Sequence, residues 1–192
     1  MPTENELKYV LKLKSEDQFD ESSKFKRYSL HQGYLAFAKG MTLRLRSSQE
    51  FIENKLDGQI KRKLCYKQKI NNRVVEIEKR LDERDFEDLW TACLNKVQKK
   101  RYVFIFKKCT WDIDFFKNHY GETYFAMAEC EMPEGQVEPE FIPDIIQKSL
   151  LYAVPVDNDQ YSTKRLACEQ HAKKLYKKLI HDKKDCYKIT TG

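Results

Sequence analysis

The chain has 192 residues and a mass of 23.0 kDa, and 34% of its residues are charged while 41% are hydrophobic. This apolar content supports a packed core and excludes wholesale disorder, and no apolar run approaches the roughly 20 residues that span a bilayer. The first residues, MPTENELKYV, lack the basic start and apolar stretch of a secretory signal, so we expect a cytoplasmic protein. We expect one domain over 1–192, in which 160–192 forms a C-terminal helix and lysine-rich tail.

The charge balance and the missing motifs narrow the chemistry. A net charge of +6, from 36 basic and 30 acidic residues, suggests an anionic partner without saying which one. The cysteines form no CxxC pair, which argues against a zinc site. Neither GxxxxGK nor GxGxxG occurs, so a glycine-rich loop that cradles phosphates is excluded.

Segments that alternate with period two predict many antiparallel strands. Asn71-Asn72 suits a hairpin turn between two of them, because Asn tolerates the left-handed backbone region. The expected strands are 4–13, 32–37, 41–47, 64–70, 73–81, 100–107, 109–116 and 123–132.

Three segments have the apolar spacing of helices: 15–24, 83–98 with Asp82 as its N-cap, and 160–181. The stretches 48–63 and 133–158 have no clear pattern, apart from a short apolar helix expected after Pro143. The chain is therefore predicted to be an α+β protein dominated by one antiparallel sheet, and the pattern leaves open whether that sheet closes.

Charged residues two apart recur in strand after strand and are sorted by sign. Side chains two apart in a strand share a face, so each pair points the same way. A sheet face that is simply exposed to solvent would carry positive, negative and neutral polar residues such as Ser and Thr in no fixed order. The sorted charges therefore favour a barrel whose lumen is lined with charge. The pairs are Glu4 and Glu6 with Lys8 following, Arg44 and Arg46, Lys67 and Lys69, Glu76 and Glu78, Lys99 and Arg101, Asp112 and Asp114, and Glu129 and Glu131.

A charged lumen is costly unless its charges are paired or coordinated. Clustered carboxylates bind hard divalent cations such as Mg²⁺ or Mn²⁺, while clustered Lys and Arg bind phosphate oxygens. Acids and bases within one tunnel therefore suit a metal-bound polyphosphate.

The ordered set of motifs resembles the CYTH domain, the family of triphosphate tunnel metalloenzymes. The resemblance covers about 4–166, nearly the whole chain. Its motifs are ExExK at 4–8, QGYL at 32–35, RLR at 44–46, KQK at 67–69, EIE at 76–78, KKR at 99–101, WDID at 111–114, AECE at 128–131 and DQYSTKRL at 159–166.

The resemblance implies an eight-stranded antiparallel β-barrel, a tunnel with a charged lumen flanked by helices, that holds a triphosphate and Mg²⁺ or Mn²⁺. Family members hydrolyse inorganic triphosphate, nucleoside triphosphates, RNA 5′-triphosphate ends or thiamine triphosphate, or they cyclise ATP. A divalent-metal-dependent triphosphatase acting on such a small molecule or RNA 5′ end is therefore expected, with no membrane partner and with a homodimer left open.

The resemblance also implies roles for individual residues. Lys8, with Glu4 and Glu6, would be catalytic, and Lys8 would position or deprotonate the attacking water. The phosphates would be bound by Arg44, Arg46, Lys67, Lys69, Lys99 and Arg101, with Arg73 a weaker candidate. The metal or its waters would be held by Glu4, Glu6, Glu76, Glu78, Glu129 and Glu131, with Asp114 a weaker candidate.

Departures from the family pattern bear on substrate choice. Ser149-Leu150-Leu151 stands where an EVT-like element is usual, and Thr163 stands where the pattern has Asn. Two rival functions stay open: an adenylate cyclase of the same fold, and a tunnel that binds nucleotides or polyphosphate without turnover.

Overall fold

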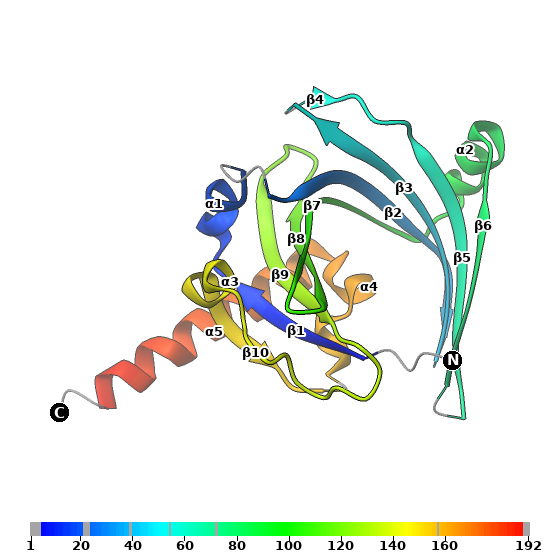
Figure 1. The fold of residues 1–192 in the computed structure, drawn as a ribbon. Coiled ribbons are helices and arrows are strands. Elements are labelled where there is room, and N and C mark those ends of the chain that lie inside the picture. The colour runs from blue at the N-terminus through cyan, green and yellow to red at the C-terminus, as the bar shows by residue number, and fades with distance from the viewer. Residues whose placement is uncertain are drawn as a thin grey trace.

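One strongly curved antiparallel sheet dominates the computed structural model (Figure 1), which describes residues 5–20, 24–38, 40–53, 55–71, 73–156 and 158–189, with side chains to 181. The described strands form a 10-stranded sheet in the order β10-β1-β9-β8-β7-β2-β3-β5-β6, and β4 pairs with β3. The strands are β1 Glu6–Leu11, β2 Lys26–Ala38, β3 Met41–Ile52, β4 Lys55–Leu56, β5 Lys61–Ile70, β6 Arg73–Arg80, β7 Asn95–Phe106, β8 Cys109–Lys117, β9 Thr123–Glu131 and β10 Leu150–Val154.

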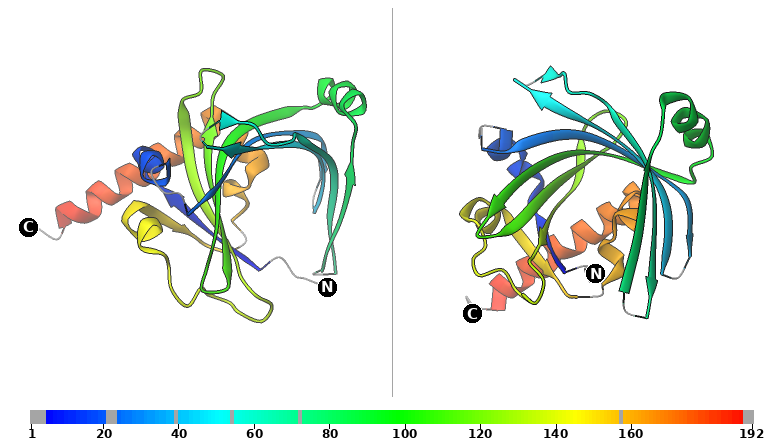
Figure 2. Two further views of the ribbon diagram at one scale, coloured as in Figure 1. Left: turned by 45° about the horizontal axis from the view of Figure 1, so that its top comes forward. Right: turned by 45° about the vertical axis from the view of Figure 1, so that its right-hand side comes forward.

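Helices lie at both faces and at one end of the sheet (Figures 1 and 2). None of the described helices is both long enough and apolar enough to cross a membrane. They are the 3₁₀ helix η1 Leu13–Ser15, α1 Glu16–Asp20, α2 Glu83–Thr91, α3 Asp144–Ser149, the 3₁₀ helix η2 Asp159–Tyr161, α4 Thr163–Leu166 and α5 Glu169–Ile189.

The sheet is open, which differs from the predicted closed eight-stranded barrel. Within the described chain, β6 pairs only with β5 and β10 pairs only with β1, so these two strands are the edges of the sheet. A register shift between Tyr34 and Ala36 in β2 adds a local bend, because a bulge increases twist and curvature. The long strands therefore curl without meeting at their edges (Figure 2).

An apolar core lies on the convex face of the β1, β7, β8 and β9 part of the sheet. Trp111 and Ile113 of β8 are fully buried there beside Tyr102 of β7. Phe19 of α1 and Ile146 of α3 cover this cluster from outside. The two short helices are thus fixed by aromatic and aliphatic burial.

A second apolar cluster fills one end of the concave face. Phe125 and Met127 of β9 pack against Leu166 of α4 and Ala172 and Leu179 of α5. Because α4 and α5 occupy this end, only the other end of the concave face is left for charged side chains.

Local patterns placed most elements correctly, and the errors have physical causes. Each expected strand has an observed counterpart, and the N-cap is confirmed because the Asp82 side chain accepts a hydrogen bond from the Asp85 N–H. The short helix after Pro143 is confirmed as α3. The turn residue Asn71 has a φ of 47°, whereas Asn72 lies outside the described residues.

The predicted helix 83–98 is wrong in its second half. Helix α2 ends at Thr91, and β7 begins at Asn95, whose backbone pairs with Tyr34 of β2. Leu94 and Val97 fit helical spacing, but in the observed strand Val97 is buried in the second apolar cluster and the backbone from Asn95 onward pairs with β2. Similarly, the predicted helix 160–181 is divided into η2, α4 and α5.

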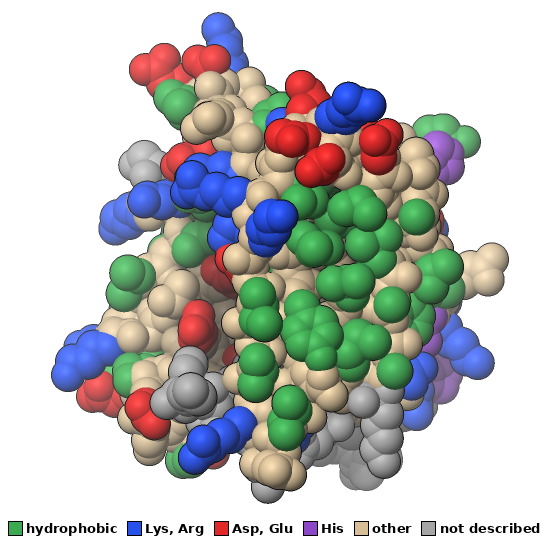
Figure 3. Space-filling model, turned by 90° about the vertical axis from the view of Figure 1, so that its right-hand side faces the viewer, with side chains coloured by type: hydrophobic (Ala, Val, Ile, Leu, Met, Phe, Trp, Pro, Cys, Tyr) green, Lys and Arg blue, Asp and Glu red, His purple; other side chains and the backbone are tan. Residues whose placement is uncertain are grey.

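The outer face of the β5–β6 hairpin is apolar and only partly covered. Figure 3 shows hydrophobic side chains gathered on the side of the molecule that carries these strands. Val75 and Ile77 of β6 are 38% and 60% exposed. Helix α2 packs near only one end of this face (Figure 1).

Gly33 lets α2 lie close on β2. A Cβ atom at this position would be 2.5 Å from Cys93 Sγ and 2.9 Å from Trp90 Cζ3. We expect Gly33→Ala to lower the free energy of unfolding by about 1–3 kcal/mol in urea denaturation, because the added methyl overpacks this contact. Adding Cys93→Ala should restore part of the loss, and an unchanged unfolding midpoint for Gly33→Ala alone would contradict the prediction.

Candidate functional site

The charged end of the concave face forms a pocket of about 460 Å³. Strand alternation brings side chains from eight strands to its wall, and the start of α4 borders it. The lining residues are Asn5, Glu6, Lys8, Tyr34, Thr42, Arg44, Arg46, Lys67, Val74, Glu76, Lys99, Arg101, Asp112, Glu129, Glu131, Met132, Glu134, Ser162, Thr163 and Lys164.

Strand register sets the rows of charge within the pocket. Glu6 of β1 lies opposite Glu131 of β9, and Lys8 lies opposite Glu129. Glu129 in turn lies opposite Asp112 of β8. Directly opposed residues of an antiparallel pair project from the same face, so these side chains form one continuous acidic surface around Lys8.

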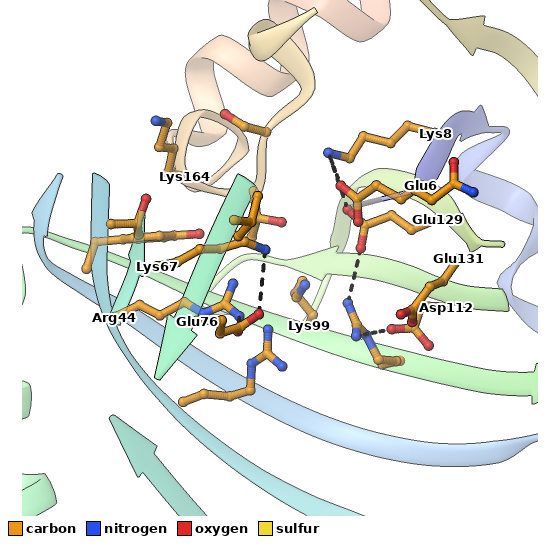
Figure 4. A pocket seen from close by; sticks show the side chains of 18 of the residues that line it. Glu6, Lys8, Arg44, Lys67, Glu76, Lys99, Asp112, Glu129, Glu131 and Lys164 are labelled. Carbon is orange, nitrogen blue, oxygen red and sulfur yellow. Dashed lines mark hydrogen bonds and ion pairs between the residues drawn. The ribbon is translucent and has the colours of Figure 1, made fainter. Parts of the chain in front are cut away.

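Carboxylates and cations occupy opposite sides of the pocket (Figure 4). We call one side the carboxylate wall, made by Glu6, Asp112, Glu129 and Glu131 together with Lys8, and the other the cation wall, made by Arg44, Arg46 and Lys67 together with Glu76. Lys99 and Arg101 of β7 lie between the walls, and Lys164 of α4 lies above the cation wall.

Lys8 is held as a cation by the carboxylate wall. Its Nζ lies 2.7 Å from Glu6 Oε1 and 3.9 Å from Glu129 Oε1. Burial disfavours the charged ammonium, but Glu129 and Glu6 outweigh it, so the pKa of Lys8 is raised above 10.5. In this arrangement Lys8 contributes positive charge and hydrogen-bond donors, which suit the predicted role of positioning the attacking water, and the alternative role of deprotonating it stays a prediction.

The donor chemistry of the carboxylate wall fits a hard divalent cation. Burial raises the pKa of Asp112, with further repulsion from Asp114 and Glu129 and an opposing attraction from Arg101. Glu131 forms no ion pair with another described residue. Crowded carboxylate oxygens of this kind are relieved by Mg²⁺ or Mn²⁺, which prefer oxygen ligands.

A different group of residues in the described chain has ligand atoms close enough to one another to hold a single metal ion. Cys65, Glu76 and Glu78 place ligand atoms within 4.8 Å of one another, whereas the carboxylate wall does not bring three ligand oxygens so close. Glu76 accepts a hydrogen bond from the Cys65 thiol at 3.0 Å and lies 3.3 Å from Arg44 Nη2. Glu76 therefore offsets part of the positive charge of the cation wall, through Arg44 and Lys67, on the side opposite Glu129.

The cation wall has unsatisfied capacity for an anion. Arg46 donates to Gln32 Oε1 at 3.2 and 3.3 Å and has no ion pair with a described carboxylate. Burial, together with Arg44 and Arg101, lowers the pKa of Arg46 to about 10, although a guanidinium stays charged at neutral pH. The buried Arg44 Nε has no hydrogen-bond partner among the described residues. Both groups are suited to a phosphate oxygen.

A buried ion cluster lies beneath the pocket between the walls. Asp114 Oδ2 accepts from Lys99 Nζ at 2.5 Å and from Arg101 Nη2 at 2.7 Å, and Oδ1 accepts from Arg101 Nε at 2.6 Å. Despite burial, Arg101 and Lys99 hold the pKa of Asp114 below its usual range, whereas burial lowers the pKa of Lys99 to about 8. Arg101 also pairs with Asp112 and lies 3.5 Å from Glu129.

Most predicted site residues converge on the pocket, and some do not. Asp114 is fully buried and does not line it, so its geometry is that of a counter-ion, which differs from the metal-ligand prediction. Glu78 pairs with Lys63 outside the lining set, and Lys69 and Arg73 are exposed near the β5–β6 turn. Glu4 lies outside the described residues. Those that line the pocket are Glu6, Lys8, Arg44, Arg46, Lys67, Glu76, Lys99, Arg101, Glu129 and Glu131.

Several lining residues were not singled out from the sequence as site residues. Asp112 and Thr42 follow directly from period two, since each lies two positions before a charged residue of the same strand. Tyr34 shares a face with Gln32 within the QGYL segment. Lys164 had no comparable local signal, because only the packing of α4 brings it to the pocket.

Comparisons with known proteins give two distant structural likenesses. No protein-family profile matches the chain, and no curated protein matches it. A conserved hypothetical protein from Pyrococcus furiosus is 17% identical with a TM-score of 0.47, over 74% of this chain and 85% of that one. A candidate adenylate cyclase from Bacillus halodurans is 12% identical with a TM-score of 0.46, over 76% and 96%. The function is therefore argued from the pocket's own residues.

Removing the central counter-ion should destabilise the protein strongly. Asp114→Asn leaves Lys99 and Arg101 as buried cations, so we expect the free energy of unfolding to fall by about 3–5 kcal/mol in urea denaturation. Asp159→Asn, which breaks an exposed pair with Arg165, is the matched control and should cost less than about 1 kcal/mol. Equal losses for the two variants would contradict the prediction, and failure of Asp114→Asn alone to fold would agree with it.

Proposed function

We propose that the protein is a divalent-metal-dependent triphosphatase of the CYTH type, which hydrolyses the terminal phosphate of inorganic triphosphate or of a nucleoside or RNA 5′-triphosphate. The observation that carries the proposal is the separation of unlike charges across one pocket, with carboxylates on β1, β8 and β9 and cations on β3, β5 and β7. A phosphate chain would satisfy the cations, and a divalent cation held by the carboxylates would supply positive charge next to the phosphates.

The cation wall would bind and polarise the phosphates. Among the described residues Arg46 has no carboxylate partner and Arg44 Nε has no hydrogen-bond partner, and Lys67 extends from the next strand. Lys99 and Arg101 are held in place from below by Asp114. Fixed donors of this kind stabilise charge that grows on the non-bridging oxygens in the transition state, which is the main catalytic requirement of phosphoryl transfer.

The carboxylate wall would hold Mg²⁺ or Mn²⁺ through Glu6, Glu129, Glu131 and Asp112. When bound, the cation supplies positive charge that polarises phosphoryl oxygens. Lys8, which is already fixed between Glu6 and Glu129, would place a second positive charge near the terminal phosphate and orient the attacking water.

The reaction is a displacement by water. The water oxygen forms a new bond to the terminal phosphorus, and the bridging P–O bond breaks with its electron pair leaving on the remaining diphosphate. The water proton passes to solvent. Orthophosphate and diphosphate are the products from inorganic triphosphate, and a nucleoside triphosphate gives the nucleoside diphosphate.

Product analysis separates this function from its rivals. We expect steady phosphate release from triphosphate or ATP with Mg²⁺ or Mn²⁺. Arg46→Gln should lower kcat/KM by about 100-fold, because it removes a buried donor from the developing charge. Cyclic AMP with diphosphate would identify a cyclase instead, and tight binding without product would identify a binding protein.

The matched control for Arg46 is Lys63→Gln. Lys63 lies directly opposite Arg46 on β5 but does not line the pocket, and its Nζ is 2.5 Å from Glu78. This variant should keep kcat/KM within about twofold of the original protein, because exposed ion pairs contribute little. Equal losses in the two variants would count against the proposed phosphate-binding role of the cation wall.

Metal dependence tests the carboxylate wall separately. Glu129→Gln should raise the Mg²⁺ or Mn²⁺ concentration for half-maximal activity by about tenfold or more, because it removes one charged oxygen ligand. Glu83→Gln, whose exposed carboxylate pairs with Arg62 outside the pocket, should leave the metal titration unchanged. Full activity in excess EDTA, or identical titrations for the two variants, would rule out this metal site.

A further inference from the structure

A second cavity, of about 250 Å³, lies on the convex side of the sheet beneath α2. Strand alternation separates it from the charged pocket. Gln32 and Tyr34 of β2 point to the concave face, so Ser29 and His31 point to the convex one. The same two central strands, β2 and β3, therefore carry a different chemistry on each face.

The floor of this cavity is polar. Ser29 lies opposite Gln49, and His31 lies opposite Ser47, so four side chains form two adjacent cross-strand pairs. None of the four forms a side-chain hydrogen bond with another described residue. They offer two hydroxyls, an amide and an imidazole, which together present both donors and acceptors.

The walls of the cavity are aromatic and aliphatic. Phe86 and Trp90 of α2 stack with ring centroids 5.4 Å apart and an interplanar angle of 19°. Leu56 of β4 and Ile60 close another side, and β4 and α2 both lie toward the same end of the long strands (Figure 2). Apolar walls over a polar floor favour a flat ligand. Its apolar faces would lie against the walls, and the polar groups along its edge would form hydrogen bonds with the floor.

The charges at the rim do not favour an anion. Arg62 is neutralised by Glu83, and Glu87 adds a further carboxylate to the lining. Burial lowers the pKa of His31 below 6.5, so its imidazole is neutral at pH 7 and supplies one donor and one acceptor. Arg62 is the cation of this lining and is paired, whereas Lys96 lies outside the lining with its Nζ 5.5 Å from the centroid of the Trp90 ring.

We propose that the cavity beneath α2 is a second binding site, and that its ligand is an uncharged nucleobase, bound as the free base or nucleoside. A nucleobase is planar, carries donors and acceptors along its edge, and is smaller than the drug-sized ligands that fill pockets of about 300–1,000 Å³. The proposal does not rest on the triphosphatase function, because no residue is shared between the two cavities.

Nucleoside titrations test the site. The chain has two tryptophans, and Trp111 is fully buried in the core, so Trp111→Phe leaves Trp90 as the only indole reporter. Adenosine, cytidine and uridine, each added to about 10 mM, should change Trp90 fluorescence saturably with a Kd near 1 mM. The His31 imidazole resonances of the unsubstituted protein should shift over the same range, which covers any loss of stability in Trp111→Phe.

A pair of histidine variants decides whether the floor binds the ligand. His31→Ala should weaken nucleoside binding about fivefold or more, since it removes one hydrogen-bonding group from the cavity floor. His119→Ala, in the exposed turn after β8, is the matched control and should bind like the original protein. Equal affinities in the two variants, no saturable response to any nucleoside, or a response to orthophosphate instead would each overturn the proposal.

Discussion

The ion pairs that Asp114 makes with Lys99 and Arg101 are the contacts on which the pocket depends. Two cations buried between strands would be strongly unfavourable without a counter-charge, and both oxygens of Asp114 are committed to them. Arg101 then reaches Asp112 and Glu129, so one guanidinium links the buried cluster to the carboxylate wall. The buried cluster is thus tied directly to the carboxylate wall, while strand pairing through β2 connects β7 to β3, which carries Arg44 and Arg46 of the cation wall.

The concave face has an apolar end and a charged end, and the apolar end strengthens the electrostatic interactions at the charged one. Phe125 and Met127 pack against α4 and α5 at one end, and that packing excludes water from one side of the pocket. Electrostatic interactions are stronger where water is excluded, so ligands at the charged end experience a larger field than they would on an open sheet. Even without closure into a barrel, curvature and the C-terminal helices enclose a pocket of about 460 Å³.

Strands β2 and β3 carry the two kinds of chemistry on their opposite faces. On the concave face, Gln32 and Arg46 are directly opposed and belong to the charged surface. One residue earlier on β2, His31 is opposed by Ser47, and both face the neutral cavity beneath α2. Because successive side chains of a strand point to opposite faces, the two surfaces are separated by the thickness of a single sheet. Gly33 lets the segment of α2 and Cys93 approach β2 closely enough to cover the cavity on the convex face.

Alternation along single strands was enough to assign Arg44 and Arg46 to one shared face, and Glu129 and Glu131 to another, because a side chain's face depends only on its own strand. The sequence did not show how deeply each side chain on a face is buried. Asp112 and Asp114 follow the same pattern, yet Asp112 lines the pocket and Asp114 is fully buried beneath it. The end of α2 at Thr91, the open edges at β6 and β10 and the arrival of Lys164 at the pocket were likewise decided by the tertiary structure. Each of these depends on pairing and packing between segments far apart in the chain, so no local pattern encodes it.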